Sequence, residues 1–176
     1  MNNWLNIYKD IHEKSYSLSF TKTLPSDWVE KNIILPDGVS RYKGLFSYNI
    51  SPYAKEIMNR LSSTDPARCV AVMKCAQIGL TQGLIIPAMA YVISEDPAPI
   101  LYMAGDKELA RVSIQERLDP ILHSSGLMDL IRPSVIRARN QRTGNTDSAK
   151  EYAGGRLTVE GTNNVDKMRQ IRVKLG

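Results

Sequence analysis

The sequence predicts an α/β domain with a mostly parallel sheet that is covered by helices on both faces. Two short apolar runs, residues 69–73 (CVAVM) and 100–104 (ILYMA), are typical of buried strands. A strongly apolar helical pattern at 81–94 lies between them, and a second helical pattern covers 107–122. Strands that alternate with helices form parallel sheets, because the connecting helices pack on the sheet faces.

The composition indicates one soluble globular domain. The chain has 176 residues, of which 43% are hydrophobic and 23% charged, which is enough for a real core. The longest apolar region, at 84–94, is too short to span a membrane, and the N-terminus lacks the layout of a signal peptide. The two histidines argue against a His-based zinc or triad site. Cys69 and Cys75 are expected to be reduced, small, buried hydrophobic residues.

The N-terminal segment is predicted to be separate from the main domain. Residues 4–14 carry an apolar stripe near the helical period, and 15–24 form a Ser/Thr-rich linker. We therefore divide the chain into an arm at 1–24, which packs on the body or on a partner, and a domain at 25–176.

Short elements are expected before the apolar run. Residues 25–32 form a short helix that Ser26 or Asp27 caps. A turn at 35–38, LPDG, follows, because Pro, Asp and Gly favour turns. The aromatic segment 41–50 is expected to be an extended arm.

The remaining elements follow from similar signals. Pro52 is expected to begin a helix that runs to residue 61. Its apolar side consists of Ile57, Met58 and Leu61. Pro87 is expected to bend the long helix, and Asp106 to cap the next one. Residues 133–155 are polar and predict a hairpin-like or mobile region, and 156–160 alternate like a strand.

The positive charge is concentrated near the end of the chain. The formal net charge is +5. Residues 132–176 hold ten Lys/Arg and four Asp/Glu, whereas residues 1–131 hold thirteen and fourteen. This quarter either contacts a polyanion such as DNA or is a solvated basic face.

The residues that could bind a ligand are concentrated at 74–81, KCAQIGLT, where the long helix begins. The usual phosphate-binding loop has Gly first and sixth, Lys seventh and Ser/Thr eighth. Here Gly79 is sixth and Thr81 eighth, but Leu80 is seventh and Lys74 first. Lys74 could fold back across the loop and bring its ammonium to the place of the seventh-position lysine. On pattern alone, this is either a variant phosphate loop or an ordinary turn between strand and helix.

A nucleoside triphosphate needs backbone N–H donors, a lysine on its phosphates and a hydroxyl on Mg²⁺. Thr81 lies at the helix start, where that hydroxyl is required, and Gly79 allows a close backbone approach. Gln77 is either a contact to the γ-phosphate or a neighbouring subunit, or a surface loop residue. Tyr48 and Tyr53 either stack on adenine or belong to the core.

Several stretches, taken in order, resemble the large terminase subunit of tailed phages, the lambda gpA-like family. They are LPSDWVE at 24–30, SPY at 51–53, VAVMKCAQIGLT at 70–81, PILYM at 99–103 with the helix after Asp106, and GRLTVEGTN at 155–163. Their order and spacing match over nearly the whole chain. The family has a variant Walker A loop with its lysine at the first position, as Lys74 is here.

The resemblance implies a P-loop NTPase of the RecA-like ASCE type that drives double-stranded DNA into a procapsid with ATP and Mg²⁺. Lys74, Gly79 and Thr81 fall on the family's nucleotide-binding positions, with Thr81 on the Mg²⁺ of ATP. The full set of candidate cofactor-binding residues is Lys74, Gln77, Ile78, Gly79, Leu80, Thr81 and Tyr53. The expected partners are the small terminase subunit, bound through the N-terminal segment, double-stranded DNA, and the portal and procapsid. The expected location is the host cytoplasm.

One departure from the family bears on catalysis. In the family, the strand corresponding to 171–175 runs into an Asp-Glu pair that orders Mg²⁺ and activates the attacking water. This chain stops at Gly176 without that pair or the nuclease domain, and its last carboxylates are Glu160 and Asp166. Loss of a general base lowers a rate by roughly 10²–10⁴. We therefore expect a C-terminally truncated ATPase domain with little or no turnover, and an open sheet edge at 171–175 that favours self-association.

Three functions stay open at this point. The chain is the N-terminal ATP-binding portion of a packaging terminase. Alternatively, it is a naturally short, non-catalytic homologue that binds or interferes with terminase subunits or DNA. A third alternative is a basic DNA-binding domain without a nucleotide.

Overall fold

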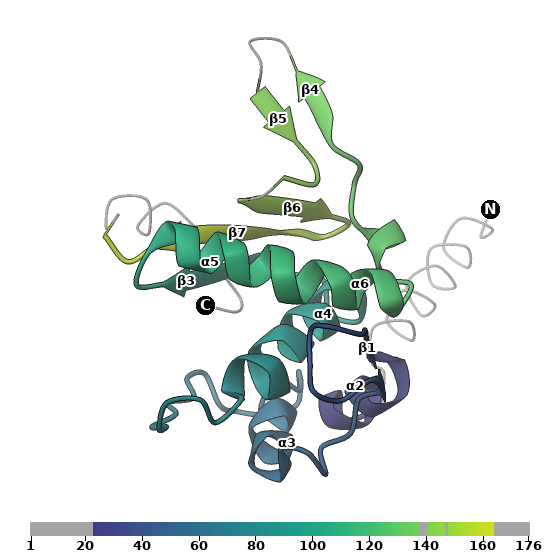
Figure 1. The fold of residues 1–176 in the computed structure, drawn as a ribbon, viewed down its shortest axis with the longest axis vertical. Coiled ribbons are helices and arrows are strands. Elements are labelled where there is room, and N and C mark those ends of the chain that lie inside the picture. Colours follow the sequence, from purple (N-terminus) through teal and green to yellow (C-terminus); the bar gives the residue numbers. More distant parts are fainter. Residues whose placement is uncertain (1–22, 138–140, 147, 164–176) are drawn as a thin grey trace, which may run out of the picture.

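The structure is a computed structural model that describes residues 23–137, 141–146 and 148–163, and it is mixed α/β (Figure 1). Its helices are α2 (Pro25–Asn32), α3 (Pro52–Asn59), α4 (Ile86–Ser94), α5 (Lys107–Ser113) and α6 (Asp119–Ser124), with π-helical segments η1 (Thr81–Ile85) and η2 (Ile114–Leu118) and the 3₁₀ turn η3 (Met128–Leu130). Its strands are β1 (Ile34–Leu35), β2 (Gly44–Leu45), β3 (Ile100–Ala104), β4 (Val135–Arg137), β5 (Gln141–Thr143), β6 (Ala149–Tyr152) and β7 (Gly155–Gly161). The predicted helix at 4–14 and strand at 171–175 lie outside the described residues.

The central sheet has the strand order β3-β7-β6. Strands β3 and β7 are parallel, from Ile100 opposite Leu157 to Ala104 opposite Gly161, and β6 pairs antiparallel with β7. Ile100 and Leu157 are almost fully buried. The predicted strands at 100–104 and 156–160 and the parallel α/β pairing are therefore confirmed.

One continuous helical run, α5–η2–α6, packs against the sheet (Figure 1). Ala110, Ile114 and Leu118 recur every four residues and are buried, so one face of the run belongs to the core. The predicted helix at 107–122 is confirmed. Asp106 occupies the N-cap position, but its side chain makes no capping hydrogen bond. Gly161 allows β7 to approach this helix closely, because a Cβ there would lie 2.7 Å from the Lys107 nitrogen.

The predicted helix at 81–94 is also confirmed, and every residue from 86 to 93 is buried. Its first turn is wider than an α-helix. The Ile86 N–H donates to the Thr81 carbonyl, five residues back. Pro87 has no N–H and cannot donate to the Gly83 carbonyl, which favours this wider turn.

The predicted strand at 69–73 is wrong. Residues 69–75 have no strand partner among the described residues and are exposed, with Met73 projecting fully into solvent. An apolar, β-branched run has strand propensity, but a strand also needs a neighbouring backbone to pair with. Instead, Val70 and Val72 line an apolar cavity of about 370 Å³ beside β3 and α4. Cys69 and Cys75 are free thiols as predicted, but they are exposed rather than buried.

The N-terminal part of the described chain agrees with most expectations. Helices α2 and α3 begin at Pro25 and Pro52 as predicted. Leu24 is the N-cap of α2, so the prediction of Ser26 or Asp27 as its cap is wrong; a proline at the first helical position already fixes the backbone there. The apolar face of α3 is confirmed, because Met58 is buried and its neighbours Ile57 and Leu61 pack on the core.

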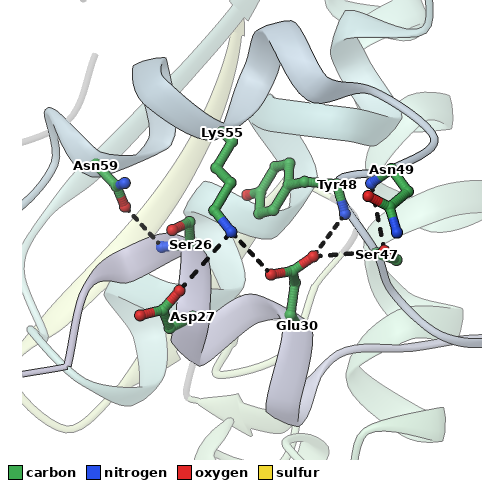
Figure 2. A network of polar contacts seen from close by, with 8 residues as sticks. All are labelled: Ser26, Asp27, Glu30, Ser47, Tyr48, Asn49, Lys55 and Asn59. Carbon is green, nitrogen blue, oxygen red and sulfur yellow. Dashed lines mark hydrogen bonds and ion pairs between the residues drawn. The ribbon is translucent and has the colours of Figure 1, made fainter.

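A polar network joins α2 to α3 (Figure 2). The Glu30 carboxylate accepts the Tyr48 N–H at 2.8 Å and the Lys55 ammonium at 3.2 Å. At the other end of α3, the Ser26 N–H donates to the Asn59 side-chain oxygen at 3.0 Å. These contacts fix α3, and with it Tyr53, against α2.

Part of the basic C-terminal quarter belongs to the interior. Lys150 on β6 is 1% exposed, and its ammonium lies 2.7 Å from Asp119 and 2.8 Å from the Asn145 side-chain oxygen. This charge is neutralised within the protein and is not presented to a polyanion. Arg132 and Arg156 are exposed. The polar stretch after Pro133 contains the β4–β5 hairpin, which projects from the body (Figure 1) and agrees with the predicted hairpin-like region.

The Glu30 network predicts a pH-dependent stability. The hydrogen bond from the Tyr48 N–H, reinforced by Lys55, lowers the pKa of Glu30 below its ordinary value of 4.5. A carboxyl whose pKa is lower in the folded state stabilises the fold above its unfolded pKa and loses that contribution as the pH falls. Urea midpoints of wild type and Glu30→Gln should therefore differ most near neutral pH and converge as the pH falls below 4.5 and through the lowered pKa of Glu30.

Glu56→Gln is the matched control, because Glu56 is an exposed carboxylate on α3. Its midpoint difference from wild type should be small at every pH. A Glu30→Gln difference that stays constant from neutral to acid pH would contradict this assignment.

Candidate functional site

The candidate loop is an exposed turn that leads directly into the buried helix. Residues 76–79 form the turn, and the helix begins at Leu80. Gln77 and Gly79 both have left-handed backbone, with φ angles of 60° and 82°. Turns in which right-handed and left-handed residues follow one another can direct successive N–H groups toward one side and form an anion-binding concavity. Gln77 holds this conformation without being glycine, a strain of order 1–3 kcal/mol that is typical of functional loops.

Helix α3 contacts this loop from the side. The Tyr53 hydroxyl donates to the Ile78 carbonyl at 2.5 Å. Partial burial raises the pKa of Tyr53, with a smaller effect from Cys75, so this hydroxyl stays a donor at neutral pH. The same helix start approaches η1 so closely that a Cβ on Gly83 would lie 2.7 Å from the Ser51 hydroxyl oxygen. Only glycine at 83 permits this packing.

Lys74 is exposed, and its ammonium lies 3.4 Å from the Cys75 carbonyl. It therefore points along the loop. Thr81 is half-buried at the start of η1, and Leu80 is nearly buried. The first N–H groups of this helix have no partner within the helix, as in any helix, and they face the turn at its N-terminus.

A small aromatic cavity adjoins the loop. It measures about 160 Å³. Its wall combines aromatic side chains with the loop itself and includes Tyr42, Phe46, Tyr53, Ile78, Gly79 and Gln82. The cavity therefore lies directly beside the turn at 76–79.

The structure thus brings six of the seven predicted cofactor residues together, namely the five consecutive residues 77–81 and Tyr53, which bonds to the loop. The seventh, Lys74, has its ammonium along the edge of the loop. Tyr48 is separate from the loop. It is 2% exposed and packs edge-on against Phe46 with ring centroids 4.9 Å apart, so of its two interpretations the core one is confirmed.

Gln82 is a residue that sequence reasoning missed. Both polar atoms of its amide are buried and have no hydrogen-bond partner among the described residues. Leaving a buried polar group unpaired costs on the order of 1–3 kcal/mol. The signal in the sequence was a single amide on a helix that is otherwise apolar from Leu84 to Ile93.

Within the described part of the chain, no group of three or more His, Cys, Asp or Glu residues could hold a metal ion. Thr81 is the hydroxyl at the helix start that such an ion could use. No helix among the described residues is long and apolar enough to cross a membrane.

The described residues form a mixed α/β domain in which a glycine-containing turn leads into a buried helix, and the N-terminus of a helix can bind an anion. Comparison with known families makes this specific. The model of the family described as phage terminase large subunit gpA, ATPase domain, matches residues 40–175, which is more than half of the chain. The chain therefore belongs to this family, and the resemblance seen in the sequence is confirmed. Searches of the curated proteins and of the solved structures gave no match.

The contact between Tyr53 and the loop predicts a local effect of a single hydroxyl. Tyr53→Phe should lower stability by about 1 kcal/mol and speed amide hydrogen exchange at residues 77–80, because the Ile78 carbonyl loses its donor. Tyr42→Phe is the control, since Tyr42 is half exposed and lines the same cavity. Equal exchange in the two variants would show that the Tyr53 hydroxyl does not hold the loop.

Proposed function

We propose that this chain binds Mg·ATP through residues 74–81 as part of the ATPase domain of a DNA-packaging terminase large subunit. Membership of the gpA ATPase domain family supports the packaging role and the use of a nucleotide. Double-stranded DNA and the phage packaging machinery, including the small terminase subunit and the portal or procapsid, are the proposed partners, and the host cytoplasm is the proposed location.

The observation that carries the nucleotide proposal is the position of the aromatic cavity. It shares Ile78 and Gly79 with the candidate phosphate loop, and Tyr53 lies between the two. A nucleotide needs a flat apolar slot for its base and N–H donors for its phosphates within one molecule's reach. The aromatic cavity could take the base and the loop could take the phosphates. An ordinary turn between two elements requires neither a cavity nor free N–H groups.

Each loop residue has a role in this proposal. The turn around Gln77 and Gly79 offers backbone N–H groups to the phosphates, and the helix start at Leu80 and Thr81 adds its positive dipole end. The Thr81 hydroxyl would hold the Mg²⁺ that accompanies ATP. Lys74 is exposed, and its side chain could turn from the Cys75 carbonyl to a phosphate. There its ammonium would form a stronger hydrogen bond, because the acceptor is charged.

Two alternative functions, a non-catalytic binding module and a basic DNA-binding domain, can be distinguished from this proposal by measuring nucleotide binding. Titrating a fluorescent ATP analogue with Mg²⁺ against wild type and Lys74→Ala should give saturable binding that the substitution weakens about tenfold to a hundredfold. That range corresponds to a charge-assisted hydrogen bond of about 1.5–3 kcal/mol.

Lys31→Ala is the matched control, because Lys31 is an exposed lysine at the end of α2. It should leave the affinity unchanged. Equal affinities of wild type and Lys74→Ala would overturn the assignment of the phosphate site.

A further inference from the structure

The amide of Gln82 makes no hydrogen bond to any described residue of the free protein. Its oxygen and nitrogen are both buried, and neither has a hydrogen-bond partner among the described residues. The rest of the helix shows that this position could be apolar, since residues 83–93 pack without such a group. A side chain retained for packing alone would not need a donor and an acceptor.

The position of this amide limits what it can meet. Gln82 lines the aromatic cavity beside Tyr53 and Gly79, and it also lines a neighbouring polar cavity bounded by Glu116 and Arg117. Ser40 lies in the wall of both. Gln82 thus lies at the boundary of the slot that the proposed nucleotide base would fill, one residue after the proposed Mg²⁺ ligand Thr81, and its amide atoms are covered there.

The chemistry of the amide selects one kind of base edge. A carboxamide offers an acceptor and a donor side by side, and this pair matches the N6 amino group and N7 of adenine. The same edge of guanine carries two acceptors, O6 and N7, so one of them would face the amide oxygen without a proton between them. Pyrimidines have no N7.

We propose that Gln82 reads the base of the bound nucleotide, with its Oε1 accepting from N6 and its Nε2 donating to N7 of adenine. The proposal rests on the nucleotide site described above and gives that site its specificity for ATP. Because both amide atoms are covered in the free protein, the base displaces the side of the 36–43 loop that carries Ser40. Arg41 and Tyr42 in this loop are exposed, so their side chains have little packing to lose.

The test compares ATP, GTP and 7-deaza-ATP, in which C–H replaces N7, by calorimetric titration in Mg²⁺ against wild type and Gln82→Met. Wild type should bind 7-deaza-ATP roughly threefold to tenfold more weakly than ATP, the effect of one hydrogen bond, and GTP more weakly still. Gln82→Met keeps the length of the side chain without its amide, and it should bind ATP and 7-deaza-ATP equally.

Two results would overturn the inference alone. Wild type could bind the three nucleotides equally while Lys74→Ala still weakens binding, or Gln82→Met could retain the preference for N7. The comparison of ATP with 7-deaza-ATP on wild type needs no variant, so it decides the question even if Gln82→Met does not fold. If wild type binds none of the three, the proposed nucleotide function falls and this inference falls with it.

Discussion

The hydrogen bond from the Tyr53 hydroxyl to the Ile78 carbonyl joins the two halves of the candidate site. On one side is an exposed turn with two left-handed residues, and on the other is a helix that the Glu30 network fixes to the N-terminal part of the domain. Because residues 69–75 have no strand partner among the described residues, this contact is one of the few that hold the loop from outside its own helix. The aromatic cavity is lined by the loop, by Tyr53 and by residues between 35 and 51.

The buried helix gives the loop its second support. Residues 86–93 are all buried, so the helix start cannot shift without disturbing the core. The wide turn at η1 and the glycine at 83 let α3 lie close to this start, with Ser51 almost in contact with the Gly83 backbone.

The sequence predicted the elements whose signals are local. The apolar helix at 81–94, the strands at 100–104 and 156–160 and the helix starts at Pro25 and Pro52 follow from periodicity and proline position, and all are confirmed. The strand at 69–73 failed because pairing depends on a neighbouring chain segment, which composition does not reveal. Gln82 was missed for a related reason: an amide in a helix looks ordinary until its surroundings show that it is buried and unpaired. The contact of Tyr53 with the loop spans 25 residues and was not predicted, because the sequence left only base stacking or a place in the core as interpretations of Tyr53.

We have proposed that the turn at 76–79, the helix start and Tyr53 form one nucleotide site. Amide hydrogen exchange with and without Mg·ATP tests it most directly, because it reports every part of the chain at once. Mg·ATP should slow exchange at residues 77–83 and around Tyr53 and leave the β4–β5 hairpin nearly unchanged. Protection that is absent from 77–83, or that appears at the hairpin instead, would contradict it.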